Sequence, residues 1–361
     1  MESKLTQTPR FPDMFPTCPA APFFDPARNA WVLSRYGDVL AALREPVLRQ
    51  TGPQKAPVQV REDVLSALSQ SKIAEWQERI EPLAFRIFAE LPSSRPVDLV
   101  SEVLRPWSLA ITSIVLGFDA VTGRRLAALQ AHLTGGNAGL LASRRPLQSL
   151  ISAWRAVQRR IANARLERLL QRVRMRGTRS LFLGLSQTLP DFLANAWLAL
   201  LEHPSQLVRL RAEPHLAPRA LEELLRYSGP VHTLTREAQQ ALKLAGVTIA
   251  QGQRVILKVA LANRDPAHFT DPNSLNIARQ NAGHLALGAG PYSCVGALLV
   301  RMAALSAIRA FADEMAGAEL VEPVVWRRGS TLDSPSSVRV RCISLESPGN
   351  RKITPSWEAS R

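Results

Sequence analysis

The sequence predicts a mainly α-helical domain with minor β-structure, and three observations favour this class. Long stretches such as 62–91 and 180–201 repeat apolar residues at helical spacing. Strand-like pieces are short and gather after Gly229-Pro230. No internal repeat or linker divides the 361 residues, and 46% of them are hydrophobic, which is enough to bury a large core. We therefore expect a single domain over residues 1–361.

The expected elements follow from periodicity and from start and stop signals. Helices are expected at Tyr36–Glu45, Glu62–Leu91 (broken once or twice), Val97–Gly117, Ser180–Leu201, Pro218–Tyr227 and Cys294–Phe311. Strands are expected at 30–33, 242–249 and 254–259, and a hairpin at 323–343. An irregular lead-in (1–29), a meander with prolines (265–282) and a loose tail (344–361) complete the chain. The helix from Cys294 carries few charges, so we expect it to be buried.

Composition argues against several classes of protein. The start, 1–15, is polar and contains prolines, unlike a signal peptide. No apolar run is expected to reach the roughly 18 to 20 residues that span a bilayer. Cys18, Cys294 and Cys342 lie far apart without CxxC spacing, which disfavours a disulfide scaffold and fits a reducing compartment. We expect a cytoplasmic protein that does not enter a membrane.

The net charge of +15 is concentrated in one segment. Arginines crowd residues 144–179, where only Glu167 opposes them. Ile151, Trp154 and Val157 recur near helical spacing, so we expect one packed and one basic, solvated face. Docking of an acidic partner, such as a carrier protein, is the alternative. Nucleic-acid binding is the usual interpretation of such a segment, but we do not expect it here.

The most informative stretch is 284–296, with the sequence HLALGAGPYSCVG. A glycine-rich loop leads to Cys294 at the start of a helix, where backbone N–H groups and the helix dipole favour a thiolate. The glycines remove Cβ atoms, so the backbone is able to lie against a planar cofactor. A dinucleotide-binding GxGxxG loop would need a glycine where Ser293 stands. The loop therefore favours a thiolate-ligated haem over a structural cysteine.

This stretch resembles the haem-binding signature of bacterial cytochromes P450, with Cys294 in the ligand position. Glu223-Leu224-Leu225-Arg226 resembles the family's ExxR helix, whose Glu and Arg form an ion pair behind the haem. Pro230 followed by Arg236 is similar to the segment whose arginine reaches a haem propionate, and 262–272 to the run before the meander. The resemblance covers nearly the whole chain. It implies the cytochrome P450 fold and haem b (iron protoporphyrin IX) as cofactor.

The resemblance also implies which residues surround the cofactor. The expected set is Arg61, Arg236, His284, Leu287, Gly288, Tyr292, Cys294 and Gly296, with Cys294 on the iron. The sequence departs from the family at several of these positions. Leu287 stands where an aromatic residue is usual, Tyr292 replaces a basic residue, and Pro57 replaces the histidine that accompanies Arg61. Ser274 stands where we expect the meander arginine.

The distal helix departs as well, over Gly184-Leu185-Ser186-Gln187-Thr188. The resemblance makes Thr188 and Gln187 the catalytic candidates, since a hydroxyl at 188 guides protons to the reacting side. The family's acid is replaced by Gln187, whose amide cannot titrate. Pro190 removes an i to i−4 hydrogen bond, which frees the carbonyl of Ser186. A local opening for water and a tolerated kink are both open as interpretations.

The substrate pocket is expected to be of mixed polarity. Its walls should include Leu185, Ser186, Val231, His232, Thr233 and Leu234, with neighbours from 55–61 and 330–332. A small, partly polar natural-product intermediate fits such walls. The chain is short for the family, and part of the missing length falls between Gly117 and Ser180, a region that normally roofs the pocket.

The resemblance implies a monooxygenase that uses O₂ and electrons from a ferredoxin and its reductase. Gln187 motivates an alternative, a haem-thiolate enzyme with peroxide-driven, coupling or redox-neutral isomerisation or dehydration chemistry. A third hypothesis is a non-catalytic module that recruits an acidic partner through residues 144–179.

Overall fold

The computed structural model describes most of the chain. The described residues are 20–50, 58–129, 160–171, 178–280, 283–329 and 331–342, without 93, 120, 124 and 127. Several expectations fall outside them, namely the lead-in up to residue 19, Pro57, most of the arginine-rich segment, Ser330 and the tail 344–361.

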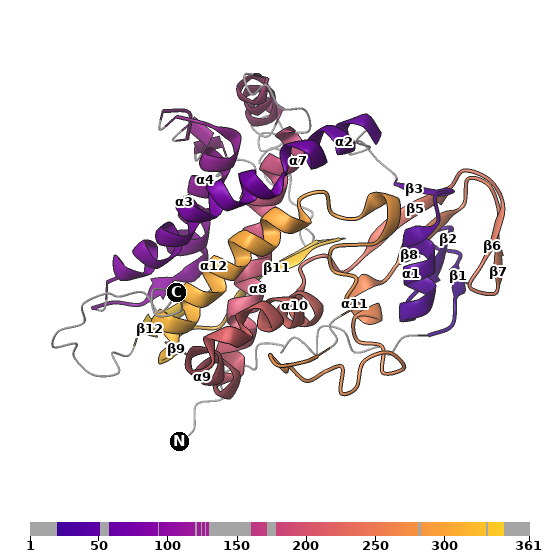
Figure 1. Cartoon of the computed structure of the whole chain (residues 1–361). Coiled ribbons are helices and arrows are strands. Elements are labelled where there is room, and N and C mark those ends of the chain that lie inside the picture. The colour runs from indigo at the N-terminus through magenta and orange to yellow at the C-terminus, as the bar shows by residue number, and fades with distance from the viewer. Residues whose placement is uncertain are drawn as a thin grey trace, which may run out of the picture.

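Helices make up most of the described chain. They are α1 Tyr36–Arg44, α2 Val58–Ala67, α3 Gln70–Ala89, α4 Arg105–Leu116, α7 Thr178–Leu183, α8 Leu189–Glu202, α9 Pro204–Ala212, α10 Ala217–Ser228, α11 Val259–Ala262 and α12 Ala297–Met315. Two π-helical stretches, η2 Leu99–Leu104 and η3 Gly184–Thr188, run directly into α4 and α8, and η4 Pro214–Leu216 and η5 Gly290–Tyr292 are short 3₁₀ turns. In Figure 1, α12 crosses the centre in front of α8, with α3 and α4 on one side and the main sheet on the other.

The core lies where α3, α8 and α12 meet. Every residue of α8 from Leu189 to Leu201 is buried. Trp197 of α8 stacks on Phe311 of α12 with ring centroids 4.7 Å apart, and Phe88 of α3 packs against both rings. Aromatic side chains bury large areas, so this cluster fixes the three helices together. The predicted burial of the helix after Cys294 is confirmed.

A five-stranded sheet lies at the other end of the molecule, in the order β1-β2-β8-β5-β3. Its strands are β1 Phe23–Asp25, β2 Ala30–Leu33, β3 Leu48–Gln50, β5 Leu234–Ala238 and β8 Arg254–Leu257; β2 and β8 are parallel and the other neighbours antiparallel. Val39 and Leu43 of α1 share a hydrophobic cluster with Val255 and Leu257 of β8. The sheet is thereby covered on one face by α1.

Smaller sheets complete the fold. They comprise β6 Leu242–Leu244 with β7 Val247–Ile249, β10 Val325–Arg328 with β11 Asp333–Ser337, and β12 Arg339–Cys342 between β4 Val97–Asp98 and β9 Ala318–Leu320. The expected hairpin at 323–343 was therefore only partly right. Residues 325–337 form it, and the last strand pairs elsewhere.

Most predicted helices are confirmed, with shifted ends. The amphipathic stretch 62–91 is broken once, at Leu68–Ser69. The helix expected from Val97 begins later, because Val97–Asp98 form β4 and Asp98 then caps η2 through the N–H of Val100. α12 begins at Ala297, three residues beyond Cys294. Neither α9 nor β5 was predicted, and β5 matters because it carries Arg236.

One apolar window is longer than the sequence led us to expect. Leu99–Leu116 is long and apolar enough to cross a membrane by length and composition, with a mean hydropathy of 1.4, and 56% of it is buried. In the structure this window is η2 and α4, whose Leu104, Trp107 and Ile111 belong to the main core cluster. Its apolar character therefore serves the packing of a core helix.

The distal helix contains the π-helical stretch η3, and Pro190 lies just beyond it. In a π-helix each N–H bonds the carbonyl five residues back, as Leu189 does to Gly184. Because Pro190 has no N–H, the carbonyl left without its helical donor is that of Leu185 rather than Ser186. The hydroxyl of Ser108 on α4 donates to this buried carbonyl at 2.5 Å. The freed carbonyl is thus satisfied by protein.

Ser108→Ala should destabilise the fold by about 1 to 3 kcal/mol, because it leaves the Leu185 carbonyl buried and unsatisfied. Ser306→Ala is the matched control. Ser306 is also buried, but its hydroxyl bonds only the carbonyl of Met302 one turn back in its own helix. Urea denaturation of both variants measures the difference. Equal losses would show that the Ser108 bond has no special role.

Candidate functional site

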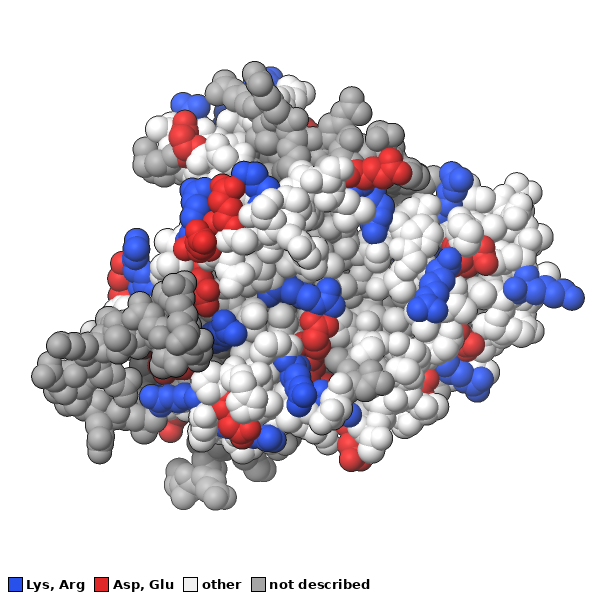
Figure 2. All heavy atoms as spheres, viewed as in Figure 1, with Lys and Arg blue, Asp and Glu red and all other residues white. Residues whose placement is uncertain are grey.

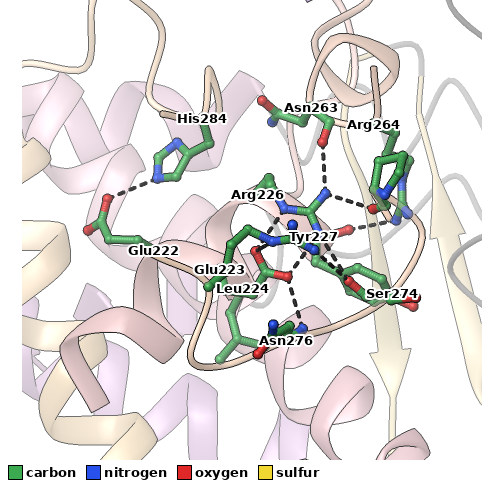
Figure 3. Close-up of polar contacts among 12 residues, drawn as sticks. Glu222, Glu223, Leu224, Arg226, Tyr227, Asn263, Arg264, Ser274, Asn276 and His284 are labelled. Carbon is green, nitrogen blue, oxygen red and sulfur yellow. Dashed lines mark hydrogen bonds and ion pairs between the residues drawn. The ribbon is translucent and has the colours of Figure 1, made fainter. Parts of the chain in front are cut away.

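The site is anchored by Glu223 and Arg226 of α10, which are 0% and 2% exposed. Arg226 donates from Nε and Nη2 to the two carboxylate oxygens of Glu223, at 2.8 and 2.9 Å (Figure 3). The residues lie three apart, so the helix places both side chains on one face. Buried charges are tolerated only when they are paired and hydrogen-bonded, and this two-pronged geometry meets that need.

The meander is tied to this pair by backbone and by a second arginine. Arg226 Nη1 donates to the carbonyls of Asn263 (2.8 Å) and Pro272 (2.7 Å), and its Nη2 donates to that of Ser274 (3.2 Å), so the expected bonds to the meander backbone are present. Yet the meander does supply an arginine. Arg279 donates from Nε to Glu223 at 2.9 Å. The expectation that Ser274 takes the place of the meander arginine was therefore wrong, since the arginine follows five residues later.

The loop that leads to Cys294 is held by its backbone. Cys294 N–H donates to the carbonyl of Leu287 at 2.7 Å, which closes the loop around the thiol. Gly288 has φ +71°, a left-handed conformation that favours glycine. A Cβ at Gly290 would lie 2.6 Å from the carbonyl oxygen of Leu43. The close approach of α1 therefore requires a glycine at position 290.

Cys294 is half-buried, close to the cations Arg61 and Arg301. Burial raises its pKa, and the Gly296 N–H together with Arg61 and Arg301 only partly offsets this. The sequence led us to expect that the anion would be favoured by the loop itself. In the structure the thiol is favoured instead, and a metal ion at Sγ would reverse the balance because coordination deprotonates a thiol outright.

Arg61 of α2 reaches the residue before the ligand cysteine. It donates from Nη1 to the Ser293 carbonyl (2.5 Å) and from Nη2 to the Ser293 hydroxyl (2.8 Å). These bonds join α2 to the cysteine loop. Arg61 thus lies in the predicted site, and its hydrogen bonds hold the loop.

His284 begins the loop and is anchored to α10 through Glu222. Its Nε2 lies 3.0 Å from a carboxylate oxygen of Glu222 (Figure 3), and its Nδ1 accepts from the Ala286 N–H at 3.3 Å. Since Nδ1 accepts, the proton lies on Nε2, which donates to the carboxylate. Arg301 of α12 adds two bonds to Glu222, at 2.6 and 2.9 Å. His284 thus fixes the start of the loop, and its contact with the cofactor stays a prediction.

Glu222 and Arg301 were missed by the sequence reasoning, although Arg301 in the apolar first half of α12 was an available signal. Burial alone would raise the pKa of Glu222, but hydrogen bonds from Arg301 and His284 outweigh it and hold the pKa at about 2. Glu222 is therefore a permanent anion that joins α10, the cysteine loop and α12.

Arg236 of β5 tests whether a haem fits. It is 2% exposed, and its Nε has no hydrogen-bond partner among the described residues. Its guanidinium lies 5.4 Å from the ring centroid of Tyr292 in the cysteine loop, and burial lowers its pKa. A buried cation without an anion is costly. A haem propionate would supply the missing anion beside the loop that carries Cys294, so these residues fit the cofactor.

The distal helix presents a narrow half-exposed stripe. Gly184, Gln187 and Thr188 are half-buried, whereas Leu185 and Ser186 are 2% and 0% exposed. The turn of the helix separates the two sets onto different faces. Leu185 and Ser186 pack into the interior, and their place in the pocket wall stays a prediction. Gly296 approaches this helix, since a Cβ there would lie 3.8 Å from Leu181.

The segment after α10 meets the hairpin as expected. Val231 forms an isolated bridge with Leu332, and His232 N–H donates to the Thr331 carbonyl at 3.0 Å. His232 Nδ1 lies 2.9 Å from the Thr233 hydroxyl, and its Nε2 lies 3.7 Å from Asp333. Val231 and His232, two of the residues expected in the mixed pocket wall, thus lie against residues 331–332.

Comparisons with known proteins agree with this geometry. The family model for Cytochrome P450 matches residues 208–309. A beta-dihydromenaquinone-9 omega-hydroxylase from Mycobacterium bovis is 26% identical over 90% of this chain and 74% of its own. Nocardicin C N-oxygenase from Nocardia uniformis is 28% identical over 86% and 89%. The LnmA cytochrome P450 hydroxylase of the leinamycin pathway from Streptomyces atroolivaceus superposes with a TM-score of 0.71, 26% identity and coverage of 94% and 97%.

The fold, the buried ExxR pair and the loop around Cys294 define a haem-thiolate protein. The matched family model, the curated relatives and the similar solved structures all indicate that the chain is a bacterial cytochrome P450. It is an oxidoreductase of the monooxygenase class.

Glu223→Ala should cost about 3 to 5 kcal/mol and abolish haem retention, because Arg226 and Arg279 would keep buried charges without an anion. Glu213→Ala is the matched control, since it removes a carboxylate from an exposed pair with Arg209. That change should cost no more than about 1 kcal/mol. Denaturation midpoints and haem content measure both. Normal haem content in Glu223→Ala would contradict the anchoring role.

The lowered pKa of Glu222 predicts that the folded protein loses stability in acid. A carboxyl group whose folded pKa is lowered stabilises the fold above its unfolded pKa, and this contribution is lost as pH falls towards the folded pKa. The free energy of unfolding should therefore drop between about pH 4.5 and 2. In Glu222→Gln the drop should be shallower. Parallel pH profiles for the two proteins would show that Glu222 does not contribute.

Proposed function

We propose that this protein is an oxygen-dependent monooxygenase that binds iron protoporphyrin IX through Cys294 and is reduced by a ferredoxin. The observation that carries the proposal is that the half-buried Cys294 shares its loop with Tyr292, whose ring faces Arg236, a buried cation with no anionic partner among the described residues. Together they provide an axial ligand and a counter-charge for a dianionic cofactor. We further propose that residues 1–361 form one cytoplasmic domain.

The residues that would hold the cofactor come from three elements. Cys294 supplies the ligand, with Leu287, Gly288 and Gly296 around it. Arg236 and Tyr292 face the propionate side, and Arg61 steadies Ser293. A thiolate-ligated haem supplies the activation of dioxygen when bound.

The chain's own residues would handle protons and water on the distal side. The Thr188 hydroxyl both donates and accepts, so it can pass a proton. The Gln187 amide can orient water but cannot release a proton of its own. For each oxygenation a substrate C–H bond, one O₂, two electrons and two protons give a hydroxylated product and water. Two protons must therefore enter this side in every cycle.

We propose a small, partly polar natural-product intermediate as substrate. His232 and Thr233 offer hydrogen bonds beside apolar Val231 and Leu234, so a ligand with few polar groups would be oriented there. The relatives support this class, because nocardicin C N-oxygenase and LnmA bear the names of natural products. The polar side chains would decide which end of the substrate approaches the iron.

A ferredoxin fits the strongly basic charge of the chain. Figure 2 shows basic side chains distributed over the face that carries α12, with acidic ones beside several of them. Arg301 and Arg309 lie on that helix, with 38% and 35% of their side chains exposed. An acidic ferredoxin would meet these cations near the cysteine loop. An acidic carrier protein at 144–179 is a further proposal, independent of this one.

Cys294→Ala tests the cofactor assignment. The wild-type protein, reduced and bound by CO, should show the long-wavelength Soret band of thiolate ligation, and the variant should lack it. Arg236→Gln should keep the band but lower haem retention, because it removes the counter-charge. A histidine-type spectrum in the wild type would contradict the assignment.

Thr188→Ala distinguishes oxygen-driven from peroxide-driven or redox-neutral chemistry. If O₂ is the oxidant, product per electron should fall by about 10²-fold or more, with electrons diverted to peroxide and substrate affinity nearly unchanged. Gln187→Glu should raise product per electron or leave it unaltered. Product yield and pyridine-nucleotide consumption measure both variants. An unchanged Thr188→Ala enzyme would refute the oxygen-driven mechanism.

A further inference from the structure

A line of polar side chains continues from the distal stripe along α8. Thr188, Asp191 and Asn195 follow at spacings of three and four residues, so they share one face of a helix whose other residues are almost all apolar. The hairpin β10–β11 lies against this face. We call these three residues, together with Arg327, Asp333 and Ser334 of the hairpin, the polar seam.

Asp191 is the centre of the polar seam. It is 9% exposed, and Arg327 Nη2 lies 2.5 Å from each of its carboxylate oxygens. The same nitrogen donates to the Ser334 hydroxyl at 2.9 Å, which itself bonds the carboxylate. The Arg327 side chain is 29% exposed, so the hydrogen-bonded line from Asp191 reaches solvent through it.

The seam continues at Asn195. Its Nδ2 donates to the Asp333 carbonyl at 3.0 Å, while its buried Oδ1 has no hydrogen-bond partner among the described residues. Asn195 and Asp333 line a small cavity with room for roughly one water molecule. A buried acceptor beside a water-sized cavity favours a bound water at Asn195.

A purely structural ion pair does not explain this arrangement well. Replacing a buried ion pair by apolar residues is often neutral or stabilising, so burial of Asp191 in an apolar helix is weak evidence of a role in stability. Buried carboxyl groups beside a reacting centre are frequent carriers of protons. Asp191 lies one helical turn from Thr188 and Gln187, the residues proposed to handle protons.

We propose that Asp191 delivers protons to the distal side through Thr188, with Arg327 as the gate to solvent. When the guanidinium moves away, the carboxylate takes a proton from water at the hairpin. The carboxyl group then passes that proton towards the Thr188 hydroxyl and returns to its pair with Arg327. Two such transfers accompany the two electrons from the ferredoxin. The inference rests on the oxygen-dependent function proposed above.

The charges around Asp191 allow a pH test. Burial raises the pKa of Asp191, against the opposing effects of Arg327, of the Ser334 hydroxyl and, more weakly, of Arg105 on α4. Removing Arg327 should raise this pKa further, because a cation favours the ionised form. A raised carboxyl pKa stabilises the fold at low pH, and this contribution is lost as pH rises through the folded value.

The experiment compares Asp191→Asn, Arg327→Gln, the double variant and the surface control Glu213→Gln in the haem-loaded protein with a surrogate ferredoxin chain. Asp191→Asn should lower product per electron at least about tenfold, increase the solvent isotope effect and remove the pH dependence of coupling. Arg327→Gln should move that pH dependence to higher pH by about one unit or more. Gln187→Glu in the Asp191→Asn background should restore coupling, because it returns an acid to the same helix face.

The free energy of unfolding gives a readout independent of turnover. In Arg327→Gln it should fall as pH rises, because the buried carboxyl must ionise without a partner, and the double variant should not show this fall. If Asp191 is only structural, Asp191→Asn and Arg327→Gln will lose coupling equally and keep the wild-type pH profile, which overturns the inference. A wild-type enzyme that forms no product from O₂ and electrons would instead overturn the proposed function.

Discussion

The placement of the whole site depends on one buried carboxylate, that of Glu223. At 0% exposure this anion is tolerable only because Arg226, Arg279 and the Asn276 N–H all donate to it. Those donors belong to α10 and to the meander, which are far apart along the chain. The hydrogen bonds to Glu223 therefore link segments that are far apart in the sequence. They fix how the meander folds against α10 and, through it, where the cysteine loop begins.

A further set of polar contacts connects α10 with the loop that carries Cys294. Glu222 lies beside Glu223 on α10, and it holds His284 at the start of the loop and Arg301 on the helix that follows. Arg61 secures Ser293 from the opposite side. The side chain of Cys294 contributes little to this order, because the loop is closed by its backbone N–H, which donates to the Leu287 carbonyl. The protein therefore prepares the position of the sulfur through its neighbours.

The sequence was sufficient for the elements that depend on local patterns. The helices around α3, α8, α10 and α12, the Glu223–Arg226 pair and the loop before Cys294 all follow from spacing or from a motif of a few residues. What it could not show depends on contacts between distant segments. Arg279 was overlooked because the support of Glu223 is decided by the path of the meander. Asp191 gave no signal in a motif, and its importance appears only when the hairpin places Arg327 against it.

The π-helical stretch at 184–188 has a consequence for how this chain tolerates change in length. It carries one residue more than an α-helix would over the same rise, and that residue sets the rotation of α7 relative to α8. Deletion of a single residue there would turn the π-helical stretch into an ordinary α-helix. The preceding helix α7 would then rotate by about 100° relative to α8. Leu181 and Phe182, now 4% and 0% exposed, would turn out of the core. Evolution can therefore exchange side chains along this stretch far more easily than it can shorten it.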